Sequence, residues 1–334
     1  MNSPTISADM PDSAATIVQA LSSDAQPHAT LDRPTDVAVR RAVVLHGGGA
    51  AGNAWEIGVI AGLYAAGLDV TRADLIIGTS AGATAAAQIT SDRRPPELFS
   101  DIVDATSDRP PRAPQSSAIQ VPLRPAVDYM EVSSAIIAAA TDALDMRRRI
   151  GAAARELDAR SDGSGQIRWR AIVAARLPSQ HWPEQEVFIT AVDADSGEPV
   201  VFDRRSGVDL VDAVAASCAI GFGVPPYTIG EHHYIDGGYR RNENADLAAG
   251  YERVVVLSPL GGRTRHPLEW GMQLAAQIEE LLAGGSEVEA VFPDSRSLEA
   301  FGFNMMDPST RPSSARAGYD QGVAAAPRLS ELWR

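Results

Sequence analysis

A serine lies within the pentapeptide Gly78-Thr79-Ser80-Ala81-Gly82, which has the G-x-S-x-G spacing of a nucleophile elbow. An apolar run, residues 74–78, leads into it, and small residues typical of a helix follow. In this context the tight turn strains the backbone of the serine, and the positive end of the helix lies near its oxygen. Glycines at 78 and 82 let the strand and the helix approach closely. We predict that Ser80 is the nucleophile of a serine hydrolase; a plain strand-to-helix turn is the alternative.

A glycine-rich segment, residues 47–52, lies between an apolar run and a helical pattern. It fits G-x-G-x-x-G, so a dinucleotide site is one interpretation, but that site requires an acidic residue at the end of the next strand. Here Asp74 begins the next strand and Gly78 ends it. The favoured interpretation is an oxyanion hole, in which bare glycine amides bind the negative oxygen of a tetrahedral intermediate. The amides in question belong to Gly47, Gly48, Gly49 and Gly52.

A serine nucleophile needs a general base, and the chain offers two candidates. The order Ser80, Asp236, His266 matches the catalytic triad of the α/β-hydrolases. Asp236 alone is the other candidate, because it follows an apolar pair whose surroundings can shield its carboxylate and tune its pKa. Downstream, Asn242 and Asn244 are placed to orient Asp236 or the backbone around it. The turn at this aspartate is completed by Gly237 and Gly238.

These side chains need a scaffold that brings distant segments together. Strand, helix, strand and helix follow one another between residues 41 and 90, which predicts a parallel sheet with right-handed crossovers. Further strands are expected at 167–174, 187–192, 200–202 and 253–257. Further helices are expected at 127–159, 210–218, 267–284 and 295–304. Residues 91–125, rich in proline and arginine, are expected to form a long irregular segment.

The composition excludes several kinds of chemistry. The 334 residues carry a formal net charge of −14, which argues against a nucleic-acid partner. All 29 basic residues are arginine, so the chain has no Walker A lysine, no Schiff-base lysine and no Ser–Lys dyad. The single cysteine, Cys218, excludes an intramolecular disulfide and fits a reducing compartment. It lies in an apolar run, which predicts a small buried side chain.

A cluster of His232, His233 and Asp236 could hold a metal, but a turn before a strand explains these residues more simply.

The N-terminal sequence and the lengths of the apolar runs suggest a location. The first twenty residues have no basic region and no apolar core typical of a signal peptide, and no apolar run is long enough to cross a bilayer. We expect a soluble, cytoplasmic protein that touches a membrane surface at most transiently. The oligomeric state is left open.

Taken together, the glycine loop, the elbow and the Asp-Gly-Gly turn resemble the patatin-like phospholipases, and they occur in the order and contexts of that family. The resemblance runs from about residue 41 to about residue 259. It includes the approach to the aspartate over 214–236, the stretch 244–248 after it, and the central strand and turn over 190–197. The resemblance implies a three-layer α/β/α fold with a central, mostly parallel sheet.

The resemblance also implies roles for individual residues. Ser80 would attack a lipid acyl ester, Asp236 would act as its general base without a histidine, and the glycine amides would hold the oxyanion. No metal or organic cofactor is needed for this chemistry. The lid or acyl-chain wall would come from residues 91–125 and the helix after them. The alternatives left open are a Ser80–Asp236–His266 triad esterase, a dinucleotide-binding protein and a non-catalytic relative that docks on membranes.

The chain departs from the family pattern at two positions. Ala51 stands where the family usually has arginine or lysine, which alters the charge and rigidity expected of the glycine loop, and Gly221 stands where proline is common. For the whole chain we expect a disordered tail over 1–39 and a catalytic domain over 40–260. C-terminal helices over 261–305 and a loosely ordered tail over 306–334 would follow.

Overall fold

The computed structural model describes residues 39–105, 126–159 and 163–334. Its strands are β1 (Arg41–Leu45), β2 (Leu75–Gly78), β3 (Glu186–Asp193), β4 (Pro199–Phe202), β5 (Tyr227–Ile229), β6 (His232–Asp236), β7 (Arg253–Leu257) and β8 (Glu287–Val291). Its α-helices are α1 (Gly49–Ala65), α2 (Ala81–Ile89), α3 (Pro95–Asp104), α4 (Ala126–Ala139), α5 (Ala143–Asp158), α6 (Ser164–Ala174), α7 (Leu210–Ser217), α8 (Leu274–Ala283), α9 (Ser295–Phe301) and α10 (Arg311–Trp333). Short 3-10 turns are η1 (Val70–Arg72), η2 (Gly237–Tyr239), η3 (Ala245–Ala248), η4 (Leu268–Trp270) and η5 (Pro308–Thr310).

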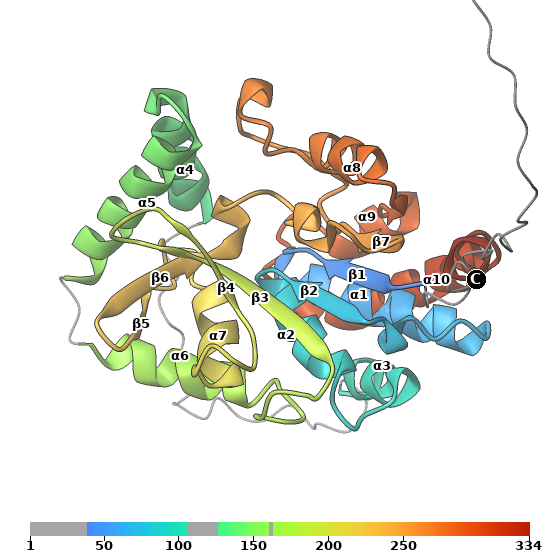
Figure 1. The fold of residues 1–334 in the computed structure, drawn as a ribbon. Helices are drawn as coiled ribbons and strands as arrows, with labels where there is room; N and C mark the ends of the chain where they lie inside the picture. Colours follow the sequence, from blue (N-terminus) through green and yellow to red (C-terminus); the bar gives the residue numbers. More distant parts are fainter. Residues whose placement is uncertain (1–38, 106–125, 160–162) are drawn as a thin grey trace, which may run out of the picture. The chain divides into compact units, whose positions relative to one another are not determined.

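One sheet joins the strands in the order β5-β6-β3-β2-β1-β7-β8, with β4 also paired to β3 (Figure 1). The pairs from β3 through β2, β1 and β7 to β8 are parallel, whereas β4, β5 and β6 form antiparallel pairs. The expected α/β architecture with a mostly parallel central sheet is therefore confirmed.

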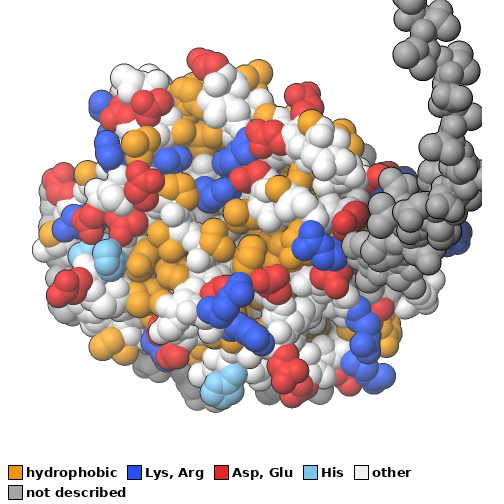
Figure 2. Space-filling model, viewed as in Figure 1, with side chains coloured by type: hydrophobic (Ala, Val, Ile, Leu, Met, Phe, Trp, Pro, Cys, Tyr) orange, Lys and Arg blue, Asp and Glu red, His pale blue; other side chains and the backbone are white. Residues whose placement is uncertain are grey.

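Both faces of the sheet are buried, as a parallel sheet requires. Alternate residues of β1 enter two separate cores: Val43 packs with α1, α2, α7 and α10, whereas Val44 packs with α8 and η3 on the opposite face. This arrangement makes three layers. A third apolar cluster joins α4 and α5 to the outer part of the sheet. The face seen in Figure 2 shows apolar side chains gathered over its middle, with charged side chains of both signs around them.

Strand pairing brings the three sequence motifs to one edge of the sheet. The last residues of β1 and β2, Leu45 and Gly78, are parallel partners, so the loops that follow them leave the same edge. On the next strand, β3, Ile189 pairs with Gly78 and Ala191 pairs with Asp236. The glycine loop, the elbow and the aspartate turn are therefore neighbours although the sequence separates them widely.

Several sequence-based boundaries were wrong. Residues 167–174 form helix α6 instead of a strand, because Trp169 and Val173 share one helical face, and the Trp169 indole donates a hydrogen bond to the Ala215 carbonyl (3.0 Å). The single helix expected over 127–159 is divided into α4 and α5, where the Asp142 side chain caps α5 by accepting from the Asp145 amide. Strand β8 falls between two expected helices and was missed.

The predictions for the irregular segment 91–125 and for the N-terminal tail compare differently with the structure. Part of the segment 91–125 is helical, since Pro95 begins α3 with a capping box from Glu97. The remainder, 106–125, lies outside the described residues, as does the tail expected over 1–39 apart from Val39.

The loose tail expected over 306–334 is instead the long helix α10, which packs along α1. Glycines form the contact: a Cβ added to Gly58 or Gly62 would lie 2.1 or 2.2 Å from a backbone oxygen of α10. In return, a Cβ on Gly318 or Gly322 would lie 2.4 or 2.2 Å from a backbone oxygen of α1. The two G-x-x-x-G pairs thus allow backbone-to-backbone contact between the helices.

We predict that Gly58→Ala destabilises the protein by about 1–3 kcal/mol, because the new methyl group must push α10 away from α1. Gly165→Ala is the matched control: Gly165 lies in α6, and its added Cβ would make an ordinary 3.6 Å contact with Pro225. Urea unfolding measures both. Equal midpoints for the two variants would contradict the close packing of α1 and α10.

Candidate active site

Ser80 occupies a turn between the end of β2 and the start of α2. Its φ is +54° and its ψ is −118°, a backbone conformation that residues other than glycine rarely adopt. The flanking glycines are required by space: a Cβ on Gly82 would lie 2.1 Å from the Leu45 carbonyl oxygen, and one on Gly78 would lie 2.6 Å from the Ala83 Cα. The chain therefore forms the strained strand–turn–helix arrangement that the sequence predicts.

Helix α7 and the residue after it hold this turn from the side. The Ser80 amide donates to the Ser217 hydroxyl at 2.9 Å, and the Cys218 thiol donates to the Ser80 carbonyl at 3.0 Å. Burial raises the pKa of Cys218 to about 12, so the thiol stays protonated and acts as a donor. Cys218 is buried as expected, and its sequence position gave no sign of the contact with the elbow.

Asp236 is the last residue of β6, and only 6% of its surface is exposed. Its carboxylate accepts a hydrogen bond from the Gly238 amide at 2.8 Å. Burial raises the pKa of Asp236 to about 6, and the nearby Ser80 side chain and the Gly238 amide oppose the shift. At neutral pH the carboxylate is therefore largely ionised yet basic enough to accept a proton.

Asn244 connects the aspartate turn to the elbow. This fully buried residue has a φ of +60°, and its side-chain nitrogen donates to the Gly237 carbonyl and the Thr79 hydroxyl, both at 3.0 Å. The same nitrogen lies 3.2 Å from the Thr190 hydroxyl of β3. Gly237 is required here, because its Cβ would lie 2.1 Å from the Thr190 hydroxyl oxygen. One amide therefore sets the position of the aspartate turn relative to the serine turn.

The glycine loop lies directly behind the nucleophile. A Cβ on Gly47 would lie 3.2 Å from the Ser80 Cβ, so bare backbone faces the serine. Among the described residues, the amides of Gly47, Gly48 and Gly49 donate no hydrogen bond. The Gly52 amide, in contrast, donates to the Gly48 carbonyl at 2.9 Å inside the first turn of α1. Three of the four expected amides therefore have no acceptor among the described residues, whereas the Gly52 amide is already engaged.

A family model for the patatin-like phospholipases matches residues 43–249, more than half of the chain. The protein belongs to the patatin-like phospholipase family. The family's chemistry makes it a lipid acyl hydrolase. A search of curated proteins finds no match to the chain.

Two solved structures are similar to this patatin-like protein at low sequence identity. VipD from Legionella pneumophila is 12% identical with a TM-score of 0.42, and the alignment covers 88% of this chain and 67% of VipD. The type III effector protein ExoU is 15% identical with a TM-score of 0.37, and the alignment covers 87% of this chain and 53% of ExoU. The patatin-like chain therefore spans about half the length of ExoU.

The segment before α10 covers the glycine loop of this patatin-like protein. The Met305 carbonyl accepts a hydrogen bond from the Ala51 amide at 2.9 Å, and a Cβ on Gly49 would lie 2.6 Å from the Met306 sulfur. In a dinucleotide site, the amides at this helix start would bind the pyrophosphate instead. The Met305 carbonyl and the family membership both argue against the dinucleotide interpretation.

Arg311, the first residue of α10, places a guanidinium beside the loop. It donates to the Asn53 side-chain oxygen at 2.9 Å and to the Ala50 carbonyl at 3.4 Å. The Asn53 side-chain nitrogen in turn reaches the Ala81 carbonyl at 3.4 Å, next to the nucleophile. A basic side chain therefore lies against this loop even though position 51 is alanine. No sequence signal pointed to Arg311.

We predict that Arg311→Gln lowers kcat about tenfold to a hundredfold with little change in KM, because the loop and the elbow lose a shared anchor. Arg311→Lys, which keeps the positive charge, should keep part of the kcat that Arg311→Gln loses. Arg316→Gln, an exposed change on the same helix, is the control. Ester turnover measures all three. A fall in kcat of the same size for Arg316→Gln would contradict a specific role for Arg311.

His266 is not brought to the serine and the aspartate. Its Nδ1 lies 3.3 Å from both the Asn242 side-chain oxygen and the Thr264 hydroxyl, and its ring stacks on Trp270. Burial, with a smaller effect of Arg265, lowers the pKa of His266 to about 4, so the ring is neutral at pH 7. Among the described residues, His266 makes no hydrogen bond to Asp236 or Ser80.

His232 and His233, the histidines of the possible metal cluster, pair with carboxylates other than Asp236. His232 lies 3.1 Å from an Asp193 carboxylate oxygen, and His233 lies 3.1 Å from one of Asp195. No group of three or more metal-binding side chains occurs in the described part of the chain. In those same residues, no helix combines the length and the apolar character needed to cross a bilayer.

Proposed function

We propose that the protein hydrolyses acyl esters of lipids through a Ser80–Asp236 dyad and an acyl-serine intermediate. The observation that carries this proposal is the placement of the buried Asp236 carboxylate next to the Ser80 turn, where the Asn244 side chain joins the aspartate turn to the elbow. His266, the other candidate base, hydrogen-bonds elsewhere. The dyad interpretation is thus supported over the triad.

In the proposed first step, Ser80 attacks the ester carbonyl while Asp236 takes the hydroxyl proton. The free amides of Gly47, Gly48 and Gly49 stabilise the oxyanion, and each such donor is worth about 2.7–4 kcal/mol in comparable acyl-transfer sites. The carbonyl re-forms as the alcohol leaves with the proton held by Asp236. Water then attacks the acyl-serine as Asp236 accepts a proton from it, and Asp236 returns this proton to the Ser80 oxygen as the bond to the acyl group breaks and the fatty acid is released.

Helix α4 supplies an apolar wall near the dyad. It borders a cavity of about 220 Å³ that is lined by Tyr129, Val132, Leu157 and Phe222, among others. The backbone three residues before Phe222 contacts Asp236, because the Ala219 carbonyl accepts a hydrogen bond from the Asp236 amide at 2.8 Å. We assign this cavity to the acyl chain, which agrees with the expectation that the helix after residue 125 forms the acyl-chain wall.

The direct test is labelling with a fluorophosphonate, followed by mass spectrometry of the modified peptide. We expect one adduct, on Ser80, in the wild type and none in Ser80→Ala. A panel of phospholipids, lysophospholipids and simple esters would then define the substrate. An adduct elsewhere, or intact folded protein that neither reacts nor turns over any ester, would contradict the proposal. In the second case, vesicle binding would favour the non-catalytic relative.

A further inference from the structure

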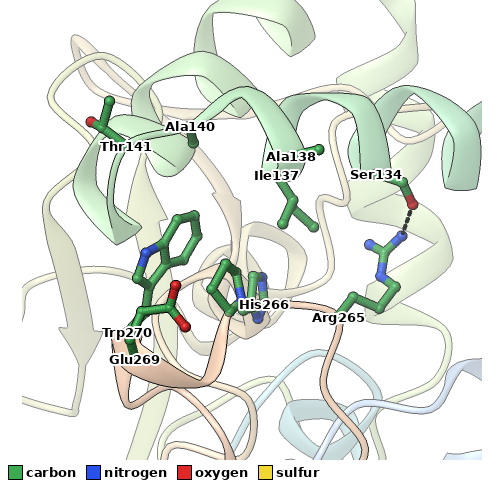
Figure 3. A pocket seen from close by; sticks show the side chains of 10 residues that line it. Ser134, Ile137, Ala138, Ala140, Thr141, Arg265, His266, Glu269 and Trp270 are labelled. Atoms are coloured by element: carbon green, nitrogen blue, oxygen red, sulfur yellow. Dashed lines mark hydrogen bonds between the residues drawn. The ribbon is translucent and has the colours of Figure 1, made fainter.

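A second cavity, of about 560 Å³, lies between α4 and the loop of residues 265–270. Figure 3 shows Ile137 and Ser134 of α4 above it, with Arg265 at one end and Trp270 with Glu269 at the other. His266 lies between the two ends. We call this cavity the Arg265–Trp270 pocket. The proposed reaction steps use none of its polar side chains.

One end of the pocket carries a cation held in place by neutral groups. The Arg265 guanidinium donates to the Ser133 hydroxyl at 3.0 Å and to the Ser134 hydroxyl at 3.2 Å, and it lies 5.9 Å from the centre of the Tyr129 ring. Among the described residues, no carboxylate forms an ion pair with Arg265. Its charge and its remaining N–H groups are thus available to a phosphate.

The other end combines an aromatic ring with a carboxylate. Trp270 stacks on His266, with 6.3 Å between ring centres, and the neighbouring Glu269 is exposed. Within the described part of the chain, Glu269 makes no ion pair. An indole face beside a carboxylate attracts a quaternary ammonium group. Because His266 is neutral at pH 7, the pocket has one positive end and one negative end.

The pocket adjoins the proposed acyl-chain cavity through Tyr129. Tyr129 contacts Arg265 on one side and also lines the apolar cavity assigned to the acyl chain. The Tyr239 hydroxyl lies 3.4 Å from the Tyr129 hydroxyl and donates to the Ile220 carbonyl at 2.9 Å. The Asp236 carboxylate is close enough to contribute to the raised pKa of both tyrosines. A lipid could therefore place its ester at the dyad and its headgroup in this pocket.

We propose that the Arg265–Trp270 pocket binds the zwitterionic phosphocholine headgroup of the lipid substrate, with phosphate at Arg265 and Ser134 and quaternary ammonium at Trp270 and Glu269. The inference rests on the proposed lipid hydrolysis and adds a preference among headgroups. A phosphoglycerol headgroup, which carries no cation, leaves Glu269 and Trp270 without a partner and is bound less tightly.

The binding test uses phosphocholine itself, without any ester. An NMR titration follows the Trp270 indole N–H, assigned by its absence in Trp270→Phe. We expect a saturable shift with phosphocholine, a weaker response to choline or inorganic phosphate alone, and at least tenfold weaker binding in Arg265→Gln and in Glu269→Gln. Arg263→Gln, an exposed neighbour outside the pocket, should match the wild type. An equal response to phosphocholine and phosphate would reduce the site to a general anion site and overturn the proposal.

The kinetic test separates this proposal from the proposed function. We expect Arg265→Gln to raise KM for dihexanoyl phosphatidylcholine about tenfold or more and to change KM for p-nitrophenyl butyrate, which has no headgroup, much less. Unchanged KM values for both substrates would overturn the headgroup pocket while the lipid hydrolase proposal survived. Loss of all ester turnover in the wild type would overturn the proposed function, and the phosphocholine titration would still decide whether the pocket binds its ligand.

Discussion

Ser80→Ala is expected to reduce ester turnover by at least about 10⁴-fold, the largest effect of any single change in this protein. We expect the Ser80 hydroxyl to form the acyl intermediate, since the neighbouring Thr79 hydroxyl is fully buried and the Cys218 thiol is buried and held protonated by its raised pKa of about 12. Fixed-time assays of Ser80→Ala with p-nitrophenyl butyrate, run at high enzyme concentration, measure its residual rate.

Two further serine variants make this prediction specific. Ser217→Ala removes the acceptor for the Ser80 amide and should lower kcat by about tenfold, through loss of the nucleophile's position. Ser206→Ala, an exposed change, should leave turnover unaltered. Wild-type turnover in Ser80→Ala would mean that the nucleophile lies elsewhere.

The parts of the site that could be predicted from sequence are local. The elbow was visible because strand, turn and helix follow one another around Ser80, and their geometry is set within about fifteen residues. Asp236 was found because an apolar strand ends in a turn that requires glycine, and the structure explains Gly237 by its contact with Thr190. In both cases the residue types reflect a steric requirement between residues that are near one another in the sequence.

The parts that could not be predicted depend on contacts between distant segments. The sequence placed Asn244 beside the aspartate turn, but it did not predict the contact of the Asn244 amide with Thr79 across 165 positions. It also did not predict the contact of Ser217 with the Ser80 amide across 137 positions. The sequence around these residues does not indicate which distant residue each of them contacts. Likewise, Arg311 and Met305 come to the glycine loop only because α10 packs on α1.

Helices α3, α6 and α10 were missed, and the structure makes the reason clear for the last two. Helix α6 is short, and its mixture of isoleucine, tryptophan and valine fits strand propensities as well as a helical face. Helix α10 is rich in alanine, glycine and serine and contains Pro327, so its apolar pattern is weak. The usable signal was Gly318 and Gly322 at a spacing of four, matched by the pair Gly58 and Gly62 in α1.

Asp236→Asn is expected to lower kcat/KM about 10²–10⁴-fold, because asparagine cannot accept the proton of Ser80. In the wild type, kcat/KM should rise with pH through the Asp236 pKa of about 6 and level off above pH 7, since only the ionised carboxylate is a base. The variant should lose this inflection. With p-nitrophenyl butyrate, which has no headgroup, His266→Ala should keep both the rate and the inflection, whereas a triad would require the reverse.

The same substitution should make the folded protein more stable at alkaline pH. Because burial raises the pKa of Asp236 in the folded state, the folded protein binds this proton more tightly than the unfolded chain does. The resulting stabilisation is complete below the unfolded pKa of about 3.9 and is lost as pH rises through about 6. A side chain that is always neutral avoids this loss, so Asp236→Asn should exceed the wild type by roughly 1–3 kcal/mol at pH 8 and by little at pH 4. Urea unfolding at both pH values tests this, and a variant that is inactive and less stable at pH 8 would show that Asp236 serves the fold instead of the reaction.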